Sequence, residues 1–163
     1  ESAGYRGNYG RTALLLTEED LSWMPSQMPQ GLVALNASPR SVLASSSDIV
    51  TQFVEAAIDD GLQRLTSHYA AAGLPCAETA LDDDALVQWL VEERMDEVVC
   101  AYAPMGPTRL RLRALRQSLA CKGISLRMQM RDYDRLVWPH ANRGFFQLGK
   151  RIPEFLDIMR GGQ

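Results

Sequence analysis

Residues 97–113 read EVVCAYAPMGPTRLRLR and place a short apolar run directly before an arginine-bearing helix. Val98 to Ala101 are small or apolar without a break, which is typical of a central strand buried on both faces of a parallel sheet. A Gly-Pro pair then interrupts the run, and Pro107 suits the first turn of a helix that Gly123 would stop. The stretch predicts a strand at 97–101 and a helix at 107–122. It also poses a choice between a ligand site and a plain turn.

Short apolar runs and longer helical patterns alternate along the rest of the chain. The apolar runs predict five strands, at 12–16, 31–35, 74–79, 97–101 and 124–130. The run at 74–79 is expected at a sheet edge, because Pro75 lacks a backbone donor. Strands that alternate with helices predict a parallel sheet covered on both sides. We therefore expect an α/β fold, a three-layer Rossmann-like domain with a parallel sheet of about five strands.

Two amphipathic helices are predicted before the strand at 97–101. The first starts near Ser47 or Asp48 and ends at Gly73. Its predicted apolar face consists of Ile49, Phe53, Ala56, Ala57, Leu62, Leu65 and Tyr69. The second starts at Asp82 to Asp84, where carboxylates favour the positive end of the helix dipole. That position favours capping over metal binding for this acidic trio.

Composition indicates a globular chain without a membrane span. The 163 residues are 46% hydrophobic and 23% charged, and the net charge of −3 gives no global basic field for nucleic acid. No apolar run approaches the roughly 20 residues that a membrane helix needs. We expect a flexible lead-in over 1–11 and a single α/β domain over 12–163. An aromatic-rich loop and a closing helix would occupy 132–163 of that domain.

The three cysteines have no metal-type spacing. Cys100 and Cys121 fall within apolar patterns, and Cys76 follows a proline. Buried, reduced thiols are typical of a cytoplasmic protein, so this location is expected. No disulfide framework is predicted.

Ligands of open α/β sheets bind beyond the carboxyl ends of the strands, where the strand order reverses. This rule selects four loops, at 17–20, 36–40, 102–109 and 131–138. In the third loop, free backbone amides near Pro107 suit an anion, with Thr108 adding a hydroxyl and Arg109 a charge. The alternative is an ordinary turn, because the chain holds neither G-x-G-x-x-G nor G-x-x-x-x-G-K-[ST].

The predicted functional residues bind a ligand and perform no catalysis. His68 and His140 are the only histidines, and no nucleophile elbow or zinc-protease motif is present. The predicted cofactor-binding residues are Thr17, Glu18, Asp20, Asn36, Tyr102, Met105, Gly106, Thr108, Arg109 and Arg131. Tyr102 and Met105 would form an apolar wall of the site. The carboxylates at 18–20 would bind ribose or a metal, or open a helix.

Arg109, Arg113 and Arg116 share one stripe of the helix at 107–122, opposite much of the leucine face. A solvated outer face explains this stripe without a ligand. Nucleic-acid binding is therefore only weakly indicated.

Residues 85–156 resemble the N-terminal α/β domain of the photolyase/cryptochrome family. The matching residues are Val98, Tyr102 and Pro104, then Arg109 to Arg116, then Gly123, Ile124 and Leu126. The resemblance implies a domain that holds or borders an antenna chromophore, such as a flavin, a deazaflavin or a pterin, or an adenine nucleotide. The first strand departs from the family, because LLLTEEDLSW replaces an arginine-rich ending.

In that family the flavin and the DNA-repair site belong to a large helical domain. This chain alone is therefore not expected to be catalytic, whereas a full-length relative would resemble a deoxyribodipyrimidine photolyase. The alternatives are a small nucleotide-binding enzyme of a related fold and a protein-interaction module. Residues 138–156 carry Trp138 and Phe146 between basic residues. They would dock the last helix onto the sheet, or contact a partner such as the helical flavin-binding domain.

Overall fold

The computed structural model describes residues 10–37 and 48–161, without the side chains of 142, 143, 145 and 147. The chain divides into two compact units, Glu1–Gln129 and Met130–Gln163, which are described separately. Most of the predicted lead-in over 1–11 lies outside the described residues, as do loop residues 38–40 and the helix start predicted at Ser47. Whether 12–163 is one domain stays a prediction.

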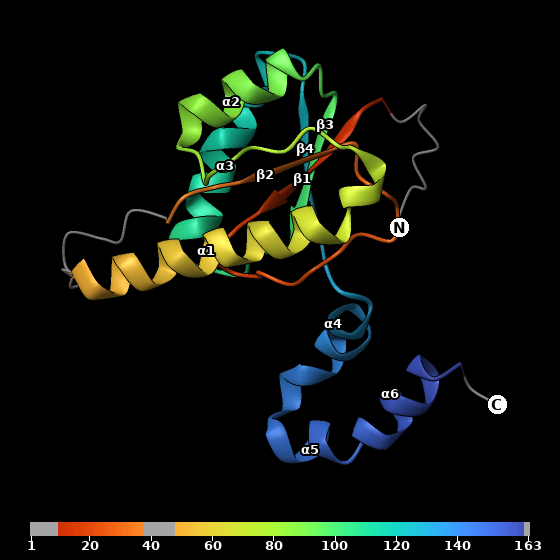
Figure 1. The fold of residues 1–163 in the computed structure, drawn as a ribbon. Helices are drawn as coiled ribbons and strands as arrows, with labels where there is room; N and C mark the ends of the chain where they lie inside the picture. The colour runs from red at the N-terminus through yellow and green to blue at the C-terminus, as the bar shows by residue number, and fades with distance from the viewer. Residues whose placement is uncertain (1–9, 38–47, 162–163) are drawn as a thin grey trace. The chain divides into compact units, whose positions relative to one another are not determined.

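The first unit contains a parallel sheet of four strands in the order β2-β1-β3-β4 (Figure 1). The strands are β1 (Thr12–Leu16), β2 (Gly31–Ala34), β3 (Glu97–Ala101) and β4 (Ser125–Gln129). Each falls on a predicted apolar run, and β1 and β3 have the predicted bounds. Buried side chains on nearly every position of β1, β2 and β3 explain why these runs lack polar alternation. The predicted parallel α/β fold is confirmed.

In place of the fifth predicted strand, at 74–79, the structure has two isolated parallel bridges, one to β2 and one to Leu35 directly after it. Cys76 pairs with Leu32, and Leu81 pairs with Leu35, while residues 78 and 79 form a bend between the bridges. The segment lies along the outer edge of β2, which agrees with the edge position expected from Pro75. The bend interrupts the ladder, and therefore the described sheet has four strands.

Helices cover both faces of the sheet in the first unit (Figure 1). Helix α1 (Asp48–His68) packs on the face that carries Leu14, Leu16 and Val99. Helices α2 (Asp83–Glu92) and α3 (Pro107–Ala120) pack on the opposite face. Because strand side chains alternate between faces, β1, β2 and β3 each contribute to two separate apolar clusters, whereas β4 contributes only to the cluster on the α2 and α3 side.

The apolar face of α1 differs from the prediction in its first half. Ile49 and Phe53 are 76% and 72% exposed, and Ala56 is exposed as well. The buried residues of α1 are Ile58, Gly61, Leu62 and Leu65. Gly61 lies so close to β1 that an added Cβ would stand 3.0 Å from a Leu16 methyl carbon. This close approach selects the face that docks. After α1, a short 3-10 helix, η1 (Ala70–Ala72), ends at Gly73 in the left-handed conformation.

Helices α2 and α3 begin differently. Asp82 caps α2, because its side chain accepts a hydrogen bond from the amide of Ala85 at 2.8 Å, as predicted for the acidic trio. Helix α3 has Gly106 at its N-cap and Pro107 at its first position, with no side-chain cap. Gly106 has a φ of +148°, a backbone conformation that favours glycine over residues with a side chain. The amino end of α3 is therefore not capped by its own residues.

The second unit consists of short helices. They are α4 (Asp132–Val137), the 3-10 helix η2 (Trp138–Arg143), α5 (Phe145–Gly149) and α6 (Ile152–Met159). Phe155 of α6 is buried, and its ring stacks on His140 with ring centroids 5.4 Å apart. Arg151 lies over the same ring and contacts His140 Nδ1 at 2.6 Å. Phe155 is thus the centre of packing in this unit.

Among the described residues, no helix combines the length and apolar character needed to cross a membrane. The structure contains no disulfide, and the three cysteines are free. Cys100 is buried as predicted, and Cys76 is half-buried. Cys121 is exposed, contrary to the prediction, because it caps the carboxyl end of α3 beyond the last buried leucine, Leu119.

Candidate functional site

The strand order reverses between β1 and β3. The chain runs from β1 to β2 on one side and then returns to place β3 on the other side of β1. The carboxyl ends of β1 and β3 therefore form the switch point at which ligands of open α/β sheets bind. Here the hydroxyl of Thr108 donates a hydrogen bond to Glu18 Oε1 at 2.8 Å. Two predicted site residues, from loops 90 positions apart, are thus brought together.

Thr17 and Thr108 are the buried polar residues of the described chain, 2% and 1% exposed. Thr108 lies in the first turn of α3, and Thr17 directly follows β1. The Thr17 hydroxyl has no hydrogen-bond partner within the described residues. A buried hydroxyl without a partner costs free energy, so this position is unusual for a purely structural turn.

Asp20, the remaining predicted residue of the first loop, makes local contacts. Asp20 Oδ1 accepts hydrogen bonds from the amide and the hydroxyl of Ser22, at 3.1 and 3.4 Å. The amide of Asp20 donates to the carbonyl of Thr17 at 3.2 Å. These contacts close a tight turn, in which Asp side chains are common. Within the described chain, no group of three or more metal-ligating side chains occurs.

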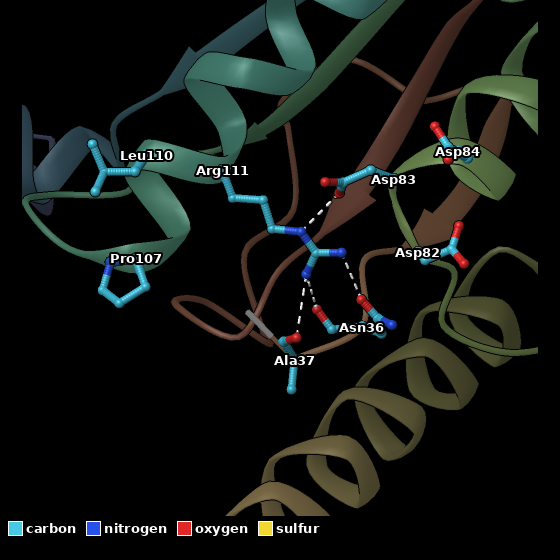
Figure 2. A pocket seen from close by; sticks show the side chains of 8 residues that line it. All are labelled: Asn36, Ala37, Asp82, Asp83, Asp84, Pro107, Leu110 and Arg111. Atoms are coloured by element: carbon cyan, nitrogen blue, oxygen red, sulfur yellow. Dashed lines mark hydrogen bonds and ion pairs between the residues drawn. The ribbon is translucent and has the colours of Figure 1, made fainter. Parts of the chain in front are cut away.

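Asn36 lies on one flank of α3, where a buried arginine binds it. Arg111 extends from α3 towards the end of β2, and its side chain is only 9% exposed (Figure 2). Its Nε bonds Asp83 Oδ1 at 2.7 Å, and its two terminal nitrogens bond the Asn36 carbonyl and Oδ1, each at 2.6 Å. A further contact reaches the Ala37 carbonyl at 3.3 Å. Arg111 therefore ties α3, α2 and the loop after β2 together.

A pocket of about 680 Å³ opens beside this arginine (Figure 2). It is lined by Asn36, Ala37, Asp82, Asp83, Asp84, Pro107, Leu110 and Arg111. We call it the acidic pocket. Arg111 is engaged by Asp83 and by oxygen atoms, so it offers little positive charge to a ligand. The carboxylates make this pocket unfavourable for the anionic group that the sequence predicted at the strand ends.

The opposite flank of α3 carries a groove of about 570 Å³ along β4. Its lining consists of Tyr102, Arg109, Arg116, Ala120, Ile124, Ser125, Leu126, Arg127 and Met128. We call it the basic groove, because the lining contains arginines and no carboxylate. It begins at Tyr102, beyond the carboxyl end of β3. Two further predicted site residues, Tyr102 and Arg109, therefore line one surface.

Arg109 lies over the Tyr102 ring, with its guanidinium carbon 5.1 Å from the ring centroid. It also contacts the Ala103 carbonyl at 3.3 Å and Met128 Sδ at 3.0 Å. Arg116, two turns further along α3, is exposed and makes no hydrogen bond or ion pair with any described residue. The groove thus offers a stacked ring at one end and an available guanidinium further along.

Arg127 also lines the groove, but its guanidinium is bound by neighbouring side chains. It is in register with Val99, whose side chain belongs to the α1 side of the sheet. Its guanidinium accordingly binds Glu97 at 3.0 and 3.2 Å and Gln129 at 3.0 Å on that side. The positive charge available in the groove therefore comes from Arg109 and Arg116.

Buried Cys100 of β3 responds to these charges. Burial raises the pKa of its thiol to about 12, while Arg116, Arg109 and Arg127 act in the opposite direction. The thiol therefore stays protonated near neutral pH and is a poor nucleophile. Cys100 has a structural role in the core.

The remaining predicted residues include Met105 and Arg131, and the place of Arg131 in the site stays a prediction. Met105 is 94% exposed and lines neither the acidic pocket nor the basic groove. Arg131 immediately precedes α4 in the second unit. The sequence interpretation missed Arg111 and Asp83. Residues two positions apart on a helix point about 200° apart. The spacing of Arg109 and Arg111 therefore indicated that the two side chains lie on nearly opposite sides of the helix.

Comparisons of the chain with protein-family models, with curated proteins and with solved structures give no match. The site is therefore interpreted from its own geometry.

Proposed function

We propose that the first unit is a Rossmann-like ligand-binding domain that takes a planar, anionic molecule, nucleotide-like or a chromophore, in the basic groove. The planar part would lie against Tyr102 and Arg109, and the negative group would reach Arg116. No catalytic step is assigned to this chain.

The observation that carries this proposal is the composition of the basic groove. An aromatic ring, two guanidinium groups and an apolar floor line one surface without a carboxylate. The floor is formed by Ile124, Leu126 and Met128. Such a combination suits a flat apolar ring with an attached anion, because stacking and charge pairing act at the two ends. The net charge of −3 makes this local excess of positive charge stand out.

The resemblance to the photolyase/cryptochrome family supplies the biological setting of the proposal. In that setting the ligand is a flavin, deazaflavin or pterin antenna, and the chain belongs to a light-dependent DNA-repair or photoreceptor protein. A small nucleotide-binding enzyme is the alternative. The absorption spectrum of the purified chain, with mass spectrometry of any released molecule, separates these two. An adenine nucleotide together with ATP turnover would support the enzyme.

The direct test is a titration of the chain with flavin mononucleotide, in which binding is measured through the quenching of the flavin fluorescence. Arg116→Gln should weaken binding roughly tenfold, because a charge-assisted contact is lost. Arg113→Gln is the matched control, since Arg113 is exposed on the same helix and lies outside the groove lining. Equal weakening by both variants would indicate nonspecific charge attraction. Absence of binding by flavin mononucleotide, AMP and a pterin would reject the proposal.

We also propose the second unit as the contact surface for a helical flavin-binding domain. Phe146 is 84% exposed and Trp138 is 56% exposed, so residues 138–156 present bulky apolar side chains. Co-expression with a photolyase-type helical domain tests this: Phe146→Ala should lower association at least tenfold. Ile158→Ala, at an exposed apolar position on α6 outside 138–156, is the control. Unchanged association in Phe146→Ala would reject this surface.

A further inference from the structure

The amino ends of α2 and α3 are satisfied in different ways. Helix α2 carries its own carboxylates, with Asp82 as the cap and Asp83 and Asp84 in the first turn. Helix α3 has no acidic residue in its first turn and no side-chain cap. A carboxylate from elsewhere, that of Glu18, binds the Thr108 hydroxyl instead. The free amides and the dipole at a helix start favour negative charge, so Glu18 occupies a position suited to an anion.

Thr17, directly before Glu18, carries a buried hydroxyl that is available to a ligand. Its hydroxyl is buried and has no hydrogen-bond partner in the described part of the chain. Leu15, two residues earlier, packs in the same cluster as Leu112 of α3. Strand side chains alternate, so Thr17 continues the α3 side of β1. An available buried hydroxyl therefore lies on the side of the sheet where α3 begins, next to the residue that binds Thr108.

We propose that the amino end of α3 is an oxyanion site, for a phosphate monoester or inorganic phosphate, which Glu18 occupies in the absence of ligand. The oxyanion displaces the Glu18 carboxylate and accepts hydrogen bonds from the Thr108 and Thr17 hydroxyls and from the first amides of α3. A tetrahedral oxyanion fits this set better than a second carboxylate, because it presents more acceptor oxygens. Glu18 thereby sets the affinity of the site. The inference goes beyond the proposed function and uses none of the basic-groove side chains.

The test is titration of the chain with inorganic phosphate, followed through the amide NMR signals of Thr17 and Thr108. Glu18→Ala should bind phosphate at least tenfold more tightly than the wild-type chain, with shifts at both amides. Glu18→Gln, which keeps a hydrogen-bond acceptor but loses the charge, should give a smaller gain. Glu19→Ala is the matched control, because Glu19 is the exposed neighbour and carries the same charge. Circular dichroism shows whether each variant is folded.

Three outcomes would overturn the inference. The first is equal phosphate affinity in the wild-type chain and Glu18→Ala. The second is an equal gain in Glu19→Ala, which would indicate only a change in net charge. The third is the absence of phosphate binding in both Glu18 variants.

Thr17→Val in the Glu18→Ala background tests whether the Thr17 hydroxyl contributes to phosphate binding. Valine has nearly the same shape and no hydroxyl, so phosphate affinity should fall at least threefold while the fold is kept. Unchanged affinity would remove Thr17 from the site. Flavin mononucleotide binding through Arg116 is measured separately, so failure here and failure of the basic groove are distinguishable.

Discussion

The two flanks of helix α3 carry arginines with opposite roles. On the flank of the acidic pocket, Arg111 is buried and bound by a carboxylate and three oxygens of the loop after β2. On the flank of the basic groove, Arg116 is exposed and without an ion-pair partner among the described residues. The same residue type, five positions apart, ties elements together on one flank and is available to a ligand on the other. The groups that surround each guanidinium therefore determine whether the arginine stabilises the fold or is available to a ligand.

The largest expected effect belongs to Arg111. Arg111→Met should destabilise the fold by about 2–4 kcal/mol, because it leaves Asp83 and the Asn36 oxygens without their donor. Urea unfolding measures this change in the free energy of unfolding. Arg109→Met is the comparison on the opposite flank and should cost about 1 kcal/mol or less, since it loses a ring contact and weak bonds. Similar losses in both variants would contradict the contrast between the flanks.

The second expected effect concerns alkaline pH and the core beneath the basic groove. Burial raises the Cys100 thiol pKa from 9.0 to about 12 in the folded chain. Between these pH values the unfolded chain loses the thiol proton while the folded chain keeps it. The free energy of unfolding therefore falls as the pH rises above 9, and the contribution of this thiol is complete only below that pH.

Unfolding measured from pH 9 to pH 11 tests this dependence on Cys100. Cys100→Ala should show a shallower fall in stability over this range than the wild-type chain. Cys121→Ala is the control, because it removes a thiol that is exposed rather than buried. The same slope in all three proteins would assign the fall to other groups.

A smaller effect is expected at the switch point between the flanks. Thr17→Val alone should stabilise the ligand-free fold by about 1 kcal/mol, because a methyl group replaces a buried hydroxyl that lacks a partner. Thermal unfolding without phosphate measures the gain. Destabilisation instead would show that the hydroxyl is hydrogen-bonded in solution.

The smallest effect is expected for the ion pair of Arg127 and Glu97, on the sheet face away from the groove. Arg127 is 42% exposed and Glu97 16% exposed, so solvent screens the pair. A double-mutant cycle of Arg127→Gln and Glu97→Gln should give a coupling of about 1 kcal/mol or less. A coupling as large as the loss in Arg111→Met would erase the distinction between exposed and buried arginines in this domain.

The strands and the order of elements could be predicted from sequence because their signals are local. Uninterrupted apolar runs marked β1 and β3, and Gly123 marked the end of the α3 segment. The prediction of the buried face of α1 was wrong in its first half, because two apolar repeats with helical spacing overlap in the same segment. The face that docks is selected by Gly61 against Leu16, a contact between distant residues.

The candidate site was predicted only in part. The loops after β1, β2 and β3 could be chosen from the rule for open α/β sheets. The Thr108–Glu18 bond spans 90 residues, and the Arg111–Asn36 bonds span 75, so no local pattern announces either. The roles of Arg109 and Arg111 likewise depend on what lies opposite them in the fold. The roles of site residues whose partners are distant in the sequence can therefore be assigned only from the structure.

The two bridges beside β2 have a consequence for self-association. The Leu32 amide and carbonyl, the Ala34 carbonyl and the Asn36 amide are bonded to residues 75–81 at 2.8 to 3.0 Å. The outer rim of β2 therefore has no row of open backbone groups with which another copy could recruit a strand. Growth of the sheet into a fibril or a swapped dimer is blocked at that rim. The amides of Leu32, Asn36, Ala77 and Leu81, which donate these bonds, should also exchange hydrogen with solvent slowly.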